Sequence, residues 1–72
     1  MKTGDWVLLN HDTASKDYLE GDLGQVVANR RSEGETIVMR IRMEKDGMIL
    51  TGHPDFVTII DPNVADIMRM AK

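Results

Sequence analysis

The stretch TIVMRIRM at residues 36–43, followed by EKDG at 44–47 and MIL at 48–50, decides the fold of this chain. Its apolar and polar side chains alternate, so that one face receives Ile37, Met39, Ile41 and Met43 and the other Thr36, Val38, Arg40 and Arg42. A period of two is typical of a half-buried strand. The Asp46-Gly47 pair then predicts a tight turn, because glycine tolerates the positive φ of a short hairpin. We therefore predict a hairpin with a buried face and an arginine face.

Further strands are predicted on both sides of this hairpin. Apolar and β-branched runs place strands at about residues 5–10, 25–31 and 56–60, beside the hairpin strands at 36–43 and 47–51. Val7 and Leu9 are expected to point inward. Residues 11–20 are polar and predict a long loop anchored by Tyr18 and Leu19. Turns are expected at 21–24, which holds two glycines, and at 32–35.

A helix is predicted at about residues 62–71. Asp61 is a suitable N-cap and Pro62 suits the first helical position. Val64, Ile67, Met68 and Ala71 recur at helical spacing, with Met70 to one side. The favoured interpretation is that this stripe covers an open end of the sheet and adds to the core. The alternative is a surface that meets a partner, for which methionine is well suited.

These elements predict a single domain over residues 1–72, a mainly β, five-stranded small antiparallel barrel with a C-terminal α-helix. Closure of so short a sheet removes exposed edges. An uncovered edge at the first or the fifth strand would instead allow pairing with a second copy of the chain.

Composition narrows the possible functions. The chain has 72 residues, 42% of them hydrophobic and 29% charged, a net charge of −3 and no cysteine. A disulfide or thiolate metal site is excluded, and the acidic balance argues against a general nucleic-acid coat. No apolar run reaches the length of a membrane span and no export signal is evident, so we expect a soluble, cytoplasmic protein.

Three short motifs resemble those of known small barrels. Gly4-Asp5-x-Val7 and Gly21-x-x-Gly24-x-Val26 are similar to the KOW pattern of ribosomal proteins and transcription elongation factors. The segment PDFV at residues 54–57 resembles the corresponding part of Src-homology-type barrels. The resemblance covers residues 4–60. It implies a five-stranded barrel whose loops and one sheet face bind RNA, another protein, or both.

The chain also departs from these families. It lacks the aromatic cluster with which signalling barrels grip proline-rich peptides, since Trp6 falls in the first strand and Tyr18 in the long loop. Binding of proline-rich peptides is therefore not expected. Its net acidity is unlike that of ribosomal members.

Basic residues of the second and third strands form the main candidate binding site. Arg40 and Arg42 share the outward face, alternation is expected to add Arg31, and Arg30 and Lys45 extend the cluster. Guanidinium groups spaced along a strand suit phosphates or carboxylates. The plainer interpretation is a solvated face balanced by acidic neighbours, namely Glu33, Glu35 and Glu44.

Other candidates are weaker. The acidic first third of the chain could steer a basic partner or simply hydrate the loop. Exposed aromatic residues could stack on bases, and the candidates are Trp6, Tyr18 and Phe56. His11 and His53 lie far apart in a sequence without metal-ligand spacing, so they are expected to be ordinary loop residues and no metal or cofactor is predicted. Ser15 and Ser32 lie in no nucleophile motif, so no enzyme is predicted.

Three functions remain open from the sequence. The first is a binding module or adaptor that docks on a larger protein or nucleoprotein assembly, such as a regulator of transcription or translation. The second is a nucleic-acid binder using the arginines. The third is an accessory subunit of an electron-transfer or metalloenzyme complex, since small barrels serve all three roles.

Overall fold

The computed structural model describes residues 2–31 and 37–71, and for residues 30, 31 and 37 it describes the backbone only. The strands are β1 (Trp6–Leu9), β2 (Leu23–Arg31), β3 (Ile37–Met43), β4 (Ile49–Gly52) and β5 (Val57–Ile60). A 3-10 turn, η1 (Pro54–Phe56), precedes β5, and the helix α1 (Pro62–Met70) follows it. The predicted mainly β architecture, five strands and a C-terminal helix, is confirmed. The turn predicted at 32–35 lies outside the described residues.

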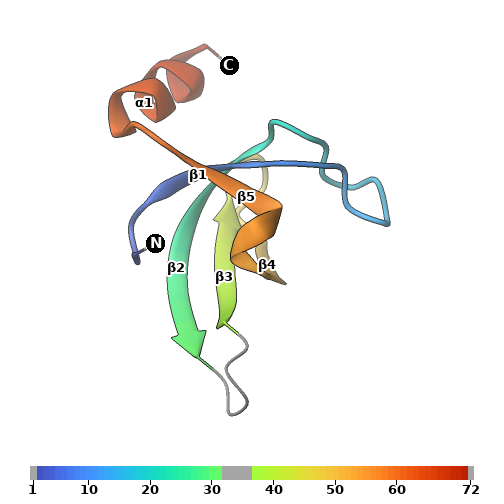
Figure 1. The fold of residues 1–72 in the computed structure, drawn as a ribbon. Helices are drawn as coiled ribbons and strands as arrows, with labels where there is room; N and C mark the ends of the chain where they lie inside the picture. Colours follow the sequence, from blue (N-terminus) through green and yellow to red (C-terminus); the bar gives the residue numbers. More distant parts are fainter. Residues whose placement is uncertain (1, 32–36, 72) are drawn as a thin grey trace.

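The strands form one antiparallel sheet in the order β4-β3-β2-β1-β5. Figure 1 shows β1 and β5 running across β2 and β3, so the sheet is strongly bent. No pairing joins β4 to β5 within the described chain, and the hydrogen-bonded sheet does not close into a barrel. The edges are therefore β4 and β5. The expectation that β1 could be an edge is wrong, because β1 pairs with β2 on one side and β5 on the other.

The central hairpin forms as predicted. Arg42 pairs with Ile49 and Met39 with Gly52 across β3 and β4. Gly47 has a φ of 75°, and its amide donates to the Met43 carbonyl at 2.8 Å. The Asp46 carboxylate accepts from the Met48 amide at 3.0 Å. The turn thus depends on the positive φ that glycine tolerates and on the aspartate carboxylate that accepts a backbone hydrogen bond.

One glycine has a different role from the one predicted. Gly24 lies inside β2, where it pairs with Val7 of β1 and Met43 of β3. A Cβ at this position would lie 2.5 Å from Ile41 Cγ2 and 3.1 Å from Met43 Sδ. The turn therefore ends at Asp22, and Gly24 is needed for close packing across the bent sheet rather than for a positive φ. Gly21, with a φ of 88°, is the turn glycine.

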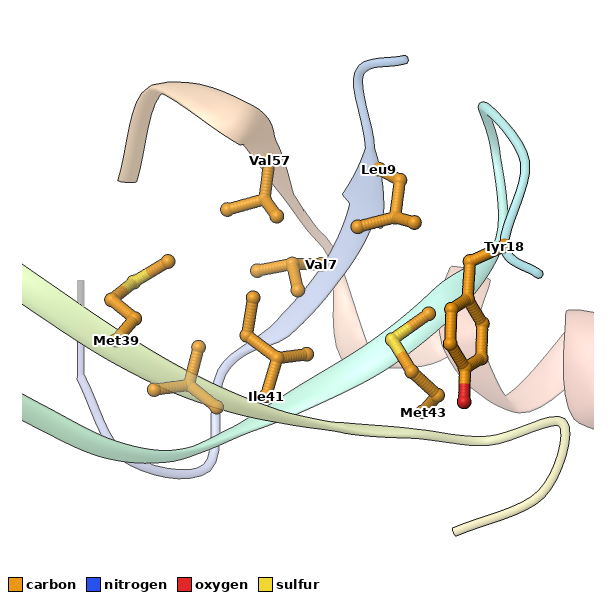
Figure 2. Packing of buried hydrophobic residues seen from close by; sticks show 8 residues of the cluster. Val7, Leu9, Tyr18, Met39, Ile41, Met43 and Val57 are labelled. Carbon is orange, nitrogen blue, oxygen red and sulfur yellow. The ribbon is translucent and has the colours of Figure 1, made fainter. Parts of the chain in front are cut away.

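The core lies between the crossed parts of the sheet. Figure 2 shows side chains of β1 and β5 meeting those of β3, with the Tyr18 ring at one end. The buried cluster is Val7, Leu9, Tyr18, Val26, Met39, Ile41, Met43 and Val57. The predicted inward residues of β1 and β3 are thus confirmed, except Ile37, whose side chain is not described. Leu19 is exposed and does not anchor the loop, contrary to expectation.

The helix begins as predicted but packs on a different face. The Asp61 side chain accepts from the Asn63 amide at 2.7 Å, and Pro62 occupies the first turn. Only Ala65 of α1 is buried, while Val64, Ile67 and Met70 are 45%, 66% and 84% exposed. The helix lies beyond the end of the sheet in Figure 1. The favoured prediction, that this stripe covers the sheet and adds to the core, is wrong for Val64, Ile67 and Ala71, which are exposed, whereas Met68 is half-buried.

Candidate functional site: an arginine face on the sheet

Two arginines stand on the outward side of β3. Arg40 and Arg42 are exposed, whereas Met39, Ile41 and Met43 between and beside them are buried. Direct partners in an antiparallel pair share a face of the sheet. The register therefore surrounds the two arginines with uncharged side chains, namely Gln25 and Ala28 of β2 and Ile49 and Thr51 of β4. We call these six residues the arginine face.

The two guanidinium groups have no charged partner in the described part of the chain. Among residues 2–29 and 38–71, whose side chains are described, neither makes an ion pair or a side-chain hydrogen bond. Glu44, predicted as a balancing charge, lies 3.4 Å from Arg69 instead. Glu33 and Glu35 lie outside the described residues. Two exposed guanidinium groups on one face have the chemistry that suits anionic groups.

The other predicted members of the cluster have different positions. Lys45 donates to the Asp17 carbonyl at 2.8 Å and lies 5.5 Å from the centre of the Tyr18 ring, so it supports the long loop. Arg30 pairs with Val38 and Arg31 with Ile37 in the strand register. The side chains of both arginines lie outside the described residues, so their membership of the patch stays a prediction.

The three predicted stacking residues are not equivalent. Tyr18 is buried in the core, so the exposure that stacking requires is missing. Trp6 is half-buried, and the Arg69 guanidinium lies 5.1 Å from its ring centre. Phe56 is 46% exposed. Its ring meets those of His11 and His53 edge-on, at centroid distances of 5.0 and 6.3 Å.

The two histidines are thus brought together on one phenylalanine, which their sequence separation hid. Asn10 holds Phe56 next to His11. Its backbone N–H donates to the Phe56 carbonyl at 2.8 Å, and its side-chain Nδ2 donates to the Asp55 carbonyl at 3.0 Å. His53 lies 3.3 Å from the Asp55 carboxylate. Within the described residues, no group of three or more histidines and carboxylates is placed to hold a metal ion.

The acidic residues of the long loop mainly hold the loop itself. The Asp12 carboxylate accepts from the Glu20 amide at 2.8 Å and lies 3.3 Å from Lys16 Nζ, and both contacts lower its pKa. Asp22 accepts from the Leu19 amide at 2.9 Å. These contacts explain Asp12 and Asp22 as residues that hold the loop, so no binding partner is needed to account for them. Asp17 and Glu20 remain exposed.

A hydrogen bond between two side chains also joins the loop to the hairpin turn. The Tyr18 hydroxyl donates to the Asp46 carboxylate at 2.7 Å. This bond, together with burial of the ring, raises the pKa of Tyr18 to about 12. The Met48 amide and then the Tyr18 hydroxyl lower the pKa of Asp46. Neither group is poised to exchange a proton near neutral pH, so this pair is structural.

Comparison of the chain with protein-family models, with curated proteins and with solved structures finds no match. In the described part of the chain, no helix has the length and apolar character needed to cross a membrane.

Proposed function

We propose that this chain is a non-enzymatic binding module that docks through its arginine face onto an acidic surface of a larger protein or nucleoprotein assembly. The observation that carries the proposal is that Arg40 and Arg42 are exposed, have uncharged cross-strand partners and make no ion pair with any described side chain. An open sheet face suits an extended partner surface better than a small ligand, which prefers a concave pocket. Electrostatic complementarity of this kind sets specificity and association rate.

We further propose that the fold is of the small-barrel type to which the KOW and Src-homology motifs point. Three features support it: the strand order, the steep crossing of β1 and β5 over β2 and β3, and the 3-10 turn between β4 and β5. By the same resemblance, we propose a role in transcription or translation. The resemblance is one of pattern, so the site rather than the fold carries the functional argument.

The test is a charge reversal with a matched control. Arg40→Glu with Arg42→Glu should strongly reduce affinity capture of a specific partner from an extract of the source cell. Lys2→Glu with Lys16→Glu, two exposed positions outside the face, makes the same change in net charge and should leave capture intact. Equal capture by both variants would refute the proposal.

Nucleic acid is the second candidate, favoured by the same two guanidinium groups. Nuclease treatment before capture separates the cases, because a protein partner survives it. Titration with a single-stranded RNA oligomer adds a quantitative criterion. If the two arginines contact two phosphates, the logarithm of the association constant should fall with the logarithm of the salt concentration, with a slope of about −1.4. An affinity that does not depend on salt would exclude this mode.

A further inference from the structure

The helix α1 presents most of its apolar surface to solvent. Val64, Ile67 and Met70 recur every three residues and form one exposed stripe, whereas Ala65 is the only buried residue of the helix. A nine-residue helix has little stability of its own and normally depends on packing of its apolar side. The stripe is therefore a surface without a cover in the described part of the chain.

The orientation of the helix is fixed by contacts on its other side. The Arg69 guanidinium lies over the Trp6 ring, and its Nε is 3.4 Å from Glu44 Oε1. Ala65 precedes Arg69 by four residues, so both lie on the side that faces the sheet. Rotating the stripe inward would turn Arg69 away from the sheet and would break both the ion pair and the ring contact. The apolar stripe is thus held outward.

The surroundings of the stripe carry an excess of negative charge. Asp61 and Asp66 belong to the helix segment itself. Asp22 and Glu44 line a shallow hollow beside Met68, and Glu44 and Asp66 line a second one beside Met70. Among the described residues the nearby cations are Arg69, which is shared between Glu44 and Asp66, and Lys45, which is engaged with Asp17 and Tyr18. A complementary partner must therefore be basic as well as apolar.

We propose that the stripe of Val64, Ile67 and Met70 is the docking site for a basic amphipathic helix of a partner protein. A helix with apolar residues at i, i+3 or i+4 and i+7 matches a two-turn stripe of this kind. Its flanking lysines or arginines would meet Asp66 and the hollow at Glu44. A second copy of this chain would bring the same carboxylates together, and an anionic membrane surface would repel them. The site uses no residue of the arginine face and does not rest on the function proposed above.

Three synthetic peptides test the proposal on the full chain. They are an amphipathic Leu/Lys helix, a peptide of identical composition with the apolar stripe scrambled, and a Leu/Glu helix of the same pattern. Binding is followed by nitrogen-15 NMR titration. We expect the amphipathic basic peptide to perturb residues 61–71 and to bind about tenfold or more tighter than the other two. Equal binding of the scrambled peptide would overturn the proposal.

Two variants and a matched control locate the site. Ile67→Gln with Met70→Gln should weaken binding of the basic peptide about tenfold, since two apolar contacts are lost. Ile49→Gln removes an exposed apolar side chain from β4, away from the stripe, and should have no effect. Asp66→Asn should weaken binding about twofold and reduce its salt dependence. Unchanged β-strand resonances confirm that each variant is folded.

Two other occupants would also overturn the proposal. In one case, sedimentation equilibrium shows that the wild-type chain is a dimer and that the double variant Ile67→Gln with Met70→Gln is a monomer. The stripe would then bind a second copy of this chain. Vesicles of phosphatidylcholine, with and without phosphatidylserine, could bind the wild-type chain and not this double variant, which would assign it to a lipid surface.

Discussion

The sheet core and the helix α1 treat their apolar side chains in opposite ways. On β3 the alternation places Met39, Ile41 and Met43 in a cluster that is closed from solvent. On α1 an equally regular pattern leaves Ile67 and Met70 largely in water. Periodicity in the sequence therefore identifies which residues share a face, but it does not show whether that face packs in the core or contacts solvent. Substitutions in the two regions should therefore differ widely in their effect on stability.

Met39→Ala should have the largest effect. Met39 is completely buried between the crossed parts of the sheet, and its truncation leaves a cavity. We expect a loss of about 3 kcal/mol in the free energy of unfolding, measured by urea denaturation. A loss below about 1 kcal/mol would mean that the core is loosely packed, and the contrast with the helix would disappear.

Tyr18→Phe should have an intermediate effect, because the ring stays buried while the bond to Asp46 is lost. We expect destabilisation by about 1 kcal/mol near neutral pH. The circular dichroism signal of the sheet, followed during denaturation, gives this value.

The same variant should change how stability depends on pH. The pKa of Tyr18 in the folded chain, about 12, exceeds its ordinary value of 10. Between these values the unfolded chain loses the proton first, so wild-type stability should fall as pH rises from 10 to 12. The lowered pKa of Asp46 contributes stability above its ordinary value of 3.8, and this is lost as pH falls below it. In Tyr18→Phe the fall in stability between pH 10 and 12 should disappear. If the variant keeps the wild-type dependence of stability on pH, Tyr18 is not the source of that fall.

Arg69→Ala should affect the helix more than the sheet. The contact of Arg69 with Trp6 and the half-exposed ion pair with Glu44 contribute about 0.5–1 kcal/mol together. We expect faster amide hydrogen exchange in α1, with the strands unchanged. Equal acceleration in β1 and β3 would show that helix and sheet unfold as one unit. Lys16→Ala, which removes another exposed cation, is the control.

Ile67→Gln should have the smallest effect on stability. Its side chain is two-thirds exposed and contributes little to the folded monomer. We expect the midpoint of thermal unfolding to shift by no more than that of a typical surface substitution, within about 0.5 kcal/mol. A loss comparable with that of Met39→Ala would restore the original prediction that the stripe adds to the core.

Local chemistry predicted the strands, the Asp46-Gly47 turn and the Asp61-Pro62 helix start, because each depends on residues adjacent in the chain. Gly24 was misassigned to a turn because its role depends on Ile41 and Met43, which only the sheet register brings to it. The helix face was misassigned because Arg69, polar in any periodic pattern, packs on Trp6 and so directs the opposite side to solvent. The exposed state of Arg40 and Arg42 followed from alternation, but that Glu44 pairs with Arg69 depended on where the helix packs.

The bond between Tyr18 and Asp46 sets an order of events in folding. It joins positions 28 residues apart, and its acceptor exists in place only after the β3–β4 turn has formed. Closing a long segment costs chain entropy that a single contact recovers late. The segment between β1 and β2 should therefore become ordered after the β3–β4 hairpin and open readily, which makes it a natural point of entry for a protease.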